Sequence, residues 1–274
     1  MNTGALLVLL AALLVIGWIV GTPLLRSRRR TRQRAEALAE ADRMYLRRRV
    51  PLYRRLPDDL RVRLEGLVRV FLAEKEFIGC QGLAVTPHMR LTIAAQACLL
   101  VVGRDEHVYD DLRSILVYPS QFVVAGQWHD DDGVVTEEAR ILSGQAWDVS
   151  RIILSWEDVQ TRGQGDDAYN VVIHEFAHYL DHEAGGMVGT PAVDRSGEQR
   201  QWAEVFQHEF AALRAAVDAG AETFLDPYAS EDEAEFFAVA SEAFFEAADR
   251  LRQRHPALYA QLAAFYRLDP AAWL

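Results

Sequence analysis

The chain has 274 residues, half of them hydrophobic and a quarter charged, so it can bury a sizeable core and is not a disordered protein. The net charge of -11 is unevenly distributed, because residues 1–55 contain 12 arginines and three acidic residues, whereas residues 56–274 carry -20. A body of that charge is repelled by phosphate backbones, which argues against a nucleic-acid partner. Two cysteines, Cys80 and Cys98, are too few for a disulfide framework.

The first segment of the chain has the pattern of a membrane helix. Residues Gly4–Gly21 contain no charged side chain, and a helix of that length spans about 27 Å, close to the roughly 30 Å of a hydrocarbon core. Arginines follow from Arg26 onward, whereas a cleavable signal peptide begins with basic residues. By the positive-inside rule, the sequence predicts a single-pass anchor in the inner (cytoplasmic) membrane, with the rest of the chain facing the cytoplasm.

Three regions are predicted from these shifts in composition. Residues 1–25 are the transmembrane anchor, residues 26–50 are a basic helical stalk, and residues 51–274 are the main domain. The boundary between stalk and domain is placed at Pro51 and Pro57 because proline interrupts helices. The stalk either contacts the anionic inner leaflet or acts as a solvated spacer, and the sequence does not separate these two readings.

The main domain is predicted to be α+β and mainly helical, with a small sheet beside a helical bundle. Apolar residues recur at helical spacing after Pro57 and form a nearly continuous run over 90–102. Short strands are expected at 115–118, 122–124, 133–135 and 152–156. Further helices are expected around 168–183, 198–217, 232–250 and 255–267.

The most informative motif is His174-Glu175-Phe176-Ala177-His178. Two histidines four residues apart on a helix project from one face and can hold a single zinc ion. Glu175, one step around the helix, can then take a proton from the water that the zinc activates and pass it to the leaving amine. The apolar residues around the motif indicate a buried helix, where a charged glutamate between two histidines is costly without a role.

Zinc hydrolases use three protein ligands, so a third ligand must come from elsewhere in the chain. His182 lies on the same helix, but three ligands in line do not converge on a tetrahedral centre, so we read it as exposed or near the ligands. A later buried helix carries Glu235 and Glu242, which share a face because they are seven residues apart. Spacing alone does not say which of them binds the metal and which orients a histidine.

These motifs, together with Tyr228-Ala229-Ser230 and the run from Ala234 to Glu242, resemble the Mlc titration factor A family of bacterial zinc peptidases. Two earlier segments, Val117–Val124 and Ser143–Trp147, are also similar to that family, so the resemblance covers about residues 52–270. It implies a zincin-like fold similar to the catalytic domain of anthrax lethal factor. It further implies one Zn2+ held by His174, His178 and Glu235, with Glu175 as general base and Tyr228 as a donor to the oxyanion.

The leading hypothesis is therefore a membrane-anchored zinc metallopeptidase that hydrolyses peptide or protein substrates, with aminopeptidase-like activity on small peptides. The alternative is a non-catalytic protein that sequesters a transcriptional regulator, since the family takes its name from the repressor Mlc. Neither the substrate preference nor the oligomeric state follows from the sequence.

Overall fold

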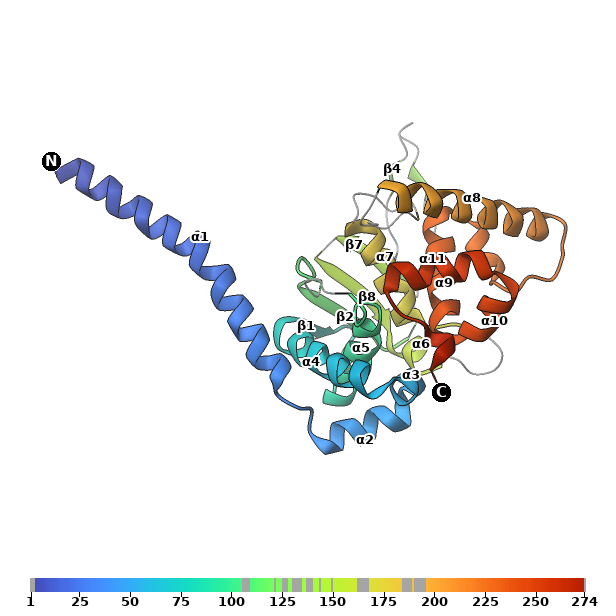
Figure 1. The fold of residues 1–274 in the computed structure, drawn as a ribbon, viewed down its shortest axis with the longest axis horizontal. Coiled ribbons are helices and arrows are strands. Elements are labelled where there is room, and N and C mark those ends of the chain that lie inside the picture. The colour runs from blue at the N-terminus through green and yellow to red at the C-terminus, as the bar shows by residue number, and fades with distance from the viewer. Residues whose placement is uncertain are drawn as a thin grey trace.

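The computed structural model consists of an extended N-terminal helix and a mixed α/β body (Figure 1). Helix α1, Thr3–Ala35, projects away from the body. Among the described residues, no helix combines the length and the apolar character needed to cross a bilayer. Most side chains of Gly4–Gly21 are outside the described part. The structure describes residues 3–104, 109–120, 122–124, 128–129, 135–136, 140–142, 144–148, 150–161, 168–183, 189 and 196–273.

Four helices follow α1 before and around the first strand. They are α2 (Glu40–Arg49), α3 (Pro51–Arg55), α4 (Asp58–Glu74) and α5 (Pro87–Leu99). Proline occupies the first turn of α3 and α5, where its missing N–H costs nothing, and Thr86 caps α5 by accepting from the amide of Met89. The predicted helices after Pro57 and over 90–102 are thus confirmed as α4 and α5.

The C-terminal third of α1 is docked on α4. Arg30 donates to both carboxylate oxygens of Glu74, at 2.8 and 2.6 Å, and to Asp110 at 2.5 Å. A Cβ atom added to Gly66 of α4 would lie 3.0 Å from the carbonyl oxygen of Arg34, so glycine permits this close approach. Leu38 and Leu46 also lie within the predicted stalk. Both are buried in the same hydrophobic core as the apolar residues of the body. The division into anchor, stalk and domain stays a prediction, but Arg30, Leu38 and Leu46 fix part of residues 26–50 on the body.

The main sheet has four strands in the order β1-β2-β8-β7. Strands β1 (Glu76–Gly79), β2 (Ser114–Tyr118) and β8 (Arg151–Ser155) are parallel, and β7 (Gly144–Asp148) runs antiparallel to β8. Two small antiparallel sheets of two strands each pair β3 (Phe122–Val124) with β6 (Arg140–Leu142) and β4 (Trp128–His129) with β5 (Val135–Thr136). The predicted strands at 115–118, 122–124 and 152–156 are confirmed, apart from Trp156, which begins α6; residues 133–134 are outside the described part.

The elements described after β8 are all helical, as predicted, so the α+β and mainly helical class is confirmed. Helices α7 and α9 lie against each other and carry the site described below. The one helix expected over 232–250 is divided at Ala247, where α9 ends and α10 begins. The elements are α6 (Trp156–Thr161), α7 (Val171–Glu183), α8 (Ser196–Asp218), η1 (Pro227–Ser230), α9 (Glu233–Glu246), α10 (Ala248–Arg254), α11 (Pro256–Tyr266) and η2 (Pro270–Ala272).

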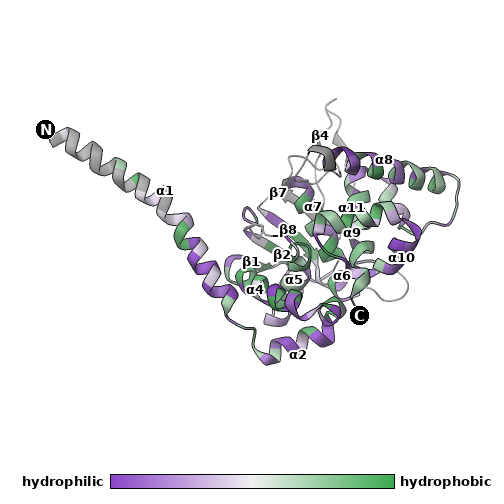
Figure 2. Cartoon of the chain, in the orientation of Figure 1, coloured by the Kyte–Doolittle hydropathy of each residue, from purple (hydrophilic) through white to green (hydrophobic). Residues whose placement is uncertain are grey.

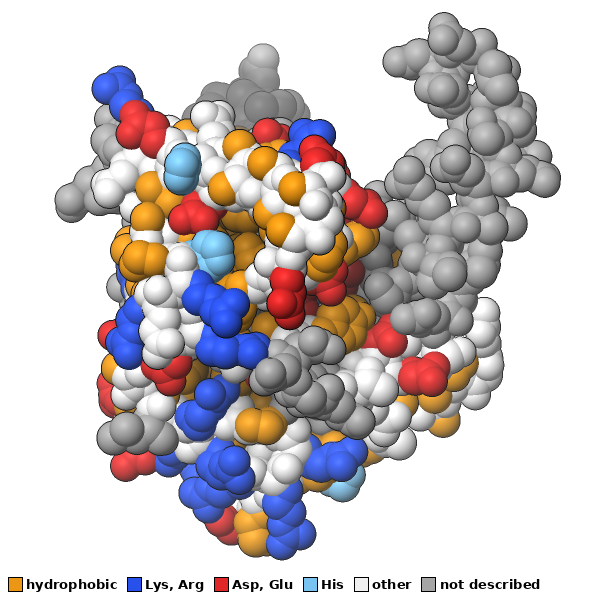
Figure 3. Space-filling view, turned by 90° about the vertical axis from the view of Figure 1, so that its right-hand side faces the viewer, with side chains coloured by type: hydrophobic (Ala, Val, Ile, Leu, Met, Phe, Trp, Pro, Cys, Tyr) orange, Lys and Arg blue, Asp and Glu red, His pale blue; other side chains and the backbone are white. Residues whose placement is uncertain are grey.

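Hydropathy and charge follow this architecture. Helices α5, α9 and α11 of the body are largely hydrophobic, whereas the arginine-rich end of α1 and helices α2 and α10 are hydrophilic (Figure 2). On the face shown in Figure 3, basic side chains gather in the lower half, the level at which α2 and α3 lie. Exposed arginines on these two helices include Arg47, Arg48, Arg49 and Arg54. The positive charge is therefore carried partly on the body itself, and not only along α1.

Candidate metal centre

Two imidazoles of α7 face the same point. His174 and His178 are one helical turn apart, so both side chains leave the same face of the helix. Their Nε2 atoms lie 3.1 Å from each other, and the two rings are nearly perpendicular, with an interplanar angle of 80°. The buried position of His178 and the largely buried position of His174 follow from the apolar residues that surround them on α7.

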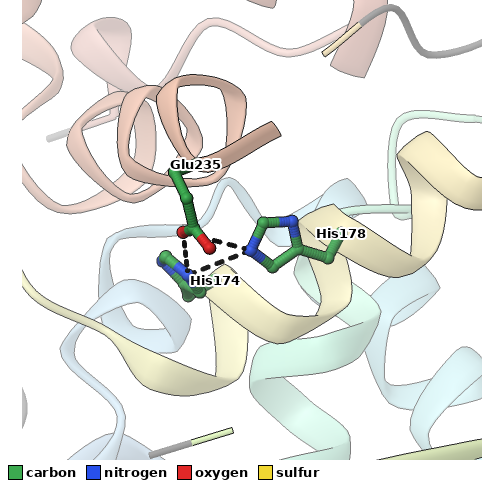
Figure 4. Close-up of side chains that lie close together, drawn as sticks. All are labelled: His174, His178 and Glu235. Atoms are coloured by element: carbon green, nitrogen blue, oxygen red, sulfur yellow. Dashed lines mark hydrogen bonds and ion pairs between the residues drawn. The ribbon is translucent and has the colours of Figure 1, made fainter. Parts of the chain in front are cut away.

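Glu235, near the start of α9, completes a group of three (Figure 4). One of its carboxylate oxygens lies 3.0 Å from Nε2 of His174 and 3.4 Å from Nε2 of His178. Ligands held tetrahedrally at about 2.0–2.1 Å from zinc are about 3.3–3.4 Å apart, close to the three separations observed. The three side chains therefore fit a metal ion of zinc's size. Among the described residues, these are the three whose possible ligand atoms lie close enough together to share one ion.

The structure places the two glutamates of α9 on different edges of the His174 ring. Glu235 meets the Nε2 edge of His174, whereas Glu242 accepts a hydrogen bond from Nδ1 on the opposite edge of the same ring, at 2.8 Å. Both glutamates reach α7 because residues seven apart lie on one face of α9. Glu235 thus faces the same point as the two Nε2 atoms, whereas Glu242 contacts the far edge of the His174 ring, where a carboxylate is common behind metal-binding histidines.

Charge and burial shape the ionisation of this cluster. Burial raises the pKa of Glu235, but hydrogen bonds with His174 and His178 outweigh it and leave this pKa well below its usual range. Burial tends to lower the pKa of His174, yet hydrogen bonds with Glu235 and Glu242 raise it well above the ordinary value. The pKa of Glu242 is raised because its burial outweighs the hydrogen bond with His174. The centre is thus strongly attractive to positive charge.

Glu175 lies between the two histidines in the sequence and is buried. Its Oε2 atom has no hydrogen-bond partner among the residues that the structure describes. Burial raises the pKa of Glu175 to about 7, against the opposing effect of His174 and His178. An unsatisfied buried carboxylate oxygen is costly, and it is typical of a site that takes up a further group.

Tyr228 lies in η1, the short turn that precedes α9. The side chain of Asp226 accepts from the amide of Tyr228 and fixes the start of this turn. The Tyr228 ring lies 6.2 Å from the His174 ring, centroid to centroid, and the residue is 45% exposed. Partial burial and the negative charge of Glu235 raise the pKa of the phenol, which therefore stays protonated and able to donate.

The structure also bears on His182, whose role the sequence left open, and on Asn170, which sequence reasoning missed. His182, in the last turn of α7, is half-buried and is not part of the metal-ligating group. Sequence reasoning missed Asn170, which hydrogen-bonds Glu242 through its backbone N–H and Glu246 through its side chain. An asparagine just before an apolar helix is a recognisable N-cap signal, but nothing in the sequence links it to a glutamate 72 positions later.

A helix that presents two histidines with a glutamate between them, and a carboxylate from a neighbouring helix as the third group, is the arrangement of a metallopeptidase. Residues 25–267 match the profile of the glucose-regulated metallo-peptidase M90 family. The chain belongs to this family, which confirms the predicted resemblance.

Two relatives extend this assignment. The chain is 38% identical over 224 residues to an uncharacterized protein, slr2042, of Synechocystis, an alignment that covers 81% of this chain and 82% of the relative. It is 36% identical over 228 residues to Mlc titration factor A of Yersinia pestis, covering 82% of this chain and 84% of the relative. Both alignments cover most of each protein.

Proposed function

We propose that the protein is a zinc-dependent peptidase of the His-Glu-x-x-His type with a downstream glutamate. The observation that carries this proposal is the convergence of His174, His178 and Glu235 beside Oε2 of Glu175, which has no hydrogen-bond partner in the described part of the chain. The ligand set of two imidazoles and one carboxylate is one that catalytic zinc sites use, with a fourth position left for water or substrate.

The proposed reaction is hydrolysis of a peptide bond. When bound, zinc would polarise the peptide carbonyl and lower the pKa of water. Glu175 accepts the proton of the attacking water and delivers it to the leaving amine, for which a carboxyl pKa near 7 is well matched. Tyr228 donates a hydrogen bond to the carbonyl oxygen as negative charge develops on it. Glu242 keeps the His174 ring oriented throughout.

We further propose that substrates include short peptides, cleaved with aminopeptidase-like activity, and that the enzyme is anchored to the inner membrane with this site in the cytoplasm. The location rests on the sequence, namely the uncharged run Gly4–Gly21 and the arginines that follow it. Cell fractionation, with protease accessibility tested from each side of the membrane, checks it. Recovery of the full-length protein in the soluble fraction contradicts the anchor.

The decisive experiment compares the wild type with Glu175→Gln. Metal analysis of the purified wild type should find one zinc per chain, and the wild type should cleave members of a broad peptide library. Glu175→Gln should retain the zinc and lose about 100- to 10,000-fold in rate, the contribution of a positioned general base. Indistinguishable hydrolysis by the two proteins refutes the enzymatic proposal.

A second candidate function is capture of a transcriptional regulator, favoured by the name Mlc titration factor A that a relative carries. In this alternative, the metal centre is not used for hydrolysis. A pull-down with a purified Mlc-like repressor distinguishes the two. Equal capture by the wild type and His174→Ala, together with no cleavage of any library peptide, favours the binding function.

A further inference from the structure

Asn170, the residue immediately before α7, starts the helix that carries both histidines. It is almost fully buried. Its side-chain Oδ1 accepts from the amide of Ile173 at 3.2 Å, and its backbone carbonyl accepts from the amide of His174 at 3.0 Å. These are the bonds of an N-cap residue, so Asn170 fixes where α7 begins.

The same residue donates hydrogen bonds toward two other helices. Its side-chain Nδ2 donates to Oε1 of Gln96 on α5 at 2.8 Å and to Oε1 of Glu246 on α9 at 2.6 Å. Its backbone N–H donates to Oε2 of Glu242, also on α9. Asn170 therefore joins α5, α7 and α9 at one buried point, and each of its polar groups has a partner.

Both carboxylate oxygens of Glu242 accept a hydrogen bond in this arrangement. One oxygen accepts from Asn170 and the other accepts from Nδ1 of His174. A carboxylate that is fixed at both oxygens sets the plane of the imidazole and keeps the proton on Nδ1. The lone pair of Nε2 is then available to a metal on the side that faces Glu235.

We propose that Asn170 is a positioning residue for the metal centre and acts through Glu242 on the His174 ring. This inference rests on the proposed zinc-binding function. The role of Asn170 goes beyond capping, because the two side-chain donor bonds to Gln96 and Glu246 hold in place the peptide N–H that binds Glu242.

The chemistry of the amide explains why asparagine suits this position. The side chain must accept from the start of α7 and donate to two acceptors at once, and an amide does both. Aspartate would cap the helix equally well but would bring a third carboxylate beside Glu242 and Glu246. Serine also caps well, yet its single hydroxyl proton cannot replace both donor bonds. Substitution by serine thus separates the two roles of Asn170.

The test measures zinc affinity of the full-length protein by competition with a chelator, using zinc alone as the probe. Asn170→Ser should weaken zinc binding by about 10- to 100-fold, the usual effect of losing a group that orients a metal ligand. The matched control is Thr86→Ala, which removes the N-cap of α5, away from the metal centre. Thr86→Ala should lower the melting temperature but leave zinc affinity unchanged.

Wild-type zinc affinity in Asn170→Ser, with the wild type itself binding zinc, overturns the positioning role and leaves the proposed function intact. A wild type that binds no zinc refutes the proposed function instead. Where Asn170→Ser does not fold, Gln96→Met serves in its place, because it removes one acceptor of the Asn170 amide and nearly keeps the volume. Gln96→Met should bind zinc more weakly than the wild type, and unchanged affinity again overturns the proposal.

Discussion

Glu242 accepts a hydrogen bond from Nδ1 of His174 at 2.8 Å, on the ring edge opposite to Nε2. Because Glu235 approaches Nε2 of that ring at 3.0 Å, the two carboxylates of α9 hold opposite edges of one imidazole. Their chemical environments differ accordingly. Glu235 lies where a cation would bind, whereas Glu242 lies behind the histidine and is more deeply buried. The two glutamates should therefore respond differently to the same substitution.

The first prediction compares Glu235→Gln with Glu242→Gln. Glu242→Gln should weaken zinc binding by about 10- to 100-fold, because it removes the charge that orients His174 but no ligand. Glu235→Gln should weaken it further, because a neutral amide replaces a charged ligand. Chelator competition measures both affinities. Equal losses, or the reverse order, contradict the assigned roles.

The second prediction concerns Tyr228, whose phenol is the proposed donor to the negative charge that develops in the reaction. Tyr228→Phe should lower kcat by about 10- to 100-fold, at the weak end for loss of one such donor because the residue is half-exposed and water can partly replace it. Zinc affinity should not change. Peptide hydrolysis and chelator competition give the two readouts.

The control for Tyr228→Phe is Tyr45→Phe, which removes the same hydroxyl group from another tyrosine. Tyr45 lies on α2, where it hydrogen-bonds Thr92 and stacks on His88. This variant should retain wild-type kcat. An unchanged kcat in Tyr228→Phe refutes the role of Tyr228 as a donor, and a loss of zinc would instead make it part of the ligand environment.

Much of the site was predictable because it is encoded locally. The spacing of His174 and His178 places both on one helix face, and the spacing of Glu235 and Glu242 does the same on α9. Which glutamate meets which ring edge depends on how α9 packs against α7, and this packing is a tertiary property. The pairing of Asn170 with Glu242 was hidden for the same reason.

The fold shows a similar division between local and tertiary signals. Periodic apolar residues predicted α4, α7 and α11, whereas strand β1 was missed because it is short and mostly exposed and is held by pairing with β2. The arginine-rich segment after Gly21 was read as a stalk from its charge. Its sequence carries no sign that Arg30 would be buried against Glu74, since the partner lies 44 residues away.

The third prediction concerns this contact between α1 and the body. The Arg30 side chain is only 7% exposed, so Arg30→Met leaves Glu74 and Asp110 close together without their main partner. Because Asp110 remains partly solvated and Arg26 still lies 3.3 Å from Glu74, we expect a loss of about 2 kcal/mol in unfolding free energy, below the range for a fully buried pair.

Chemical denaturation followed by tryptophan fluorescence measures this loss. Arg28→Met is the matched control, because Arg28 is exposed two positions earlier on the same helix, and its stability should stay within about 0.5 kcal/mol of the wild type. Equal stability of the two variants would mean that the docked end of α1 contributes nothing to the stability of the body.

The fourth prediction concerns Lys75, the residue after α4, which is only 4% exposed. Its ammonium donates to the backbone carbonyls of Tyr109 and Leu112, the latter at 2.8 Å. Burial lowers the pKa of Lys75 from 10.5 to about 8. Between these two values the unfolded chain binds a proton that the folded chain lacks, so this residue makes stability rise with pH across that window.

The difference in unfolding free energy between the wild type and Lys75→Met isolates this effect, because other groups titrate alike in both proteins. The difference should be constant below about pH 7.5 and should then shift in favour of the wild type by roughly 2 kcal/mol by about pH 9.5, at 1.36 kcal/mol per pH unit. Loss of the two carbonyl hydrogen bonds destabilises the variant at every pH and does not alter this slope. A difference that stays flat up to about pH 9.5 would show that the buried ammonium keeps its ordinary pKa, and that the two carbonyls fully offset the cost of its burial.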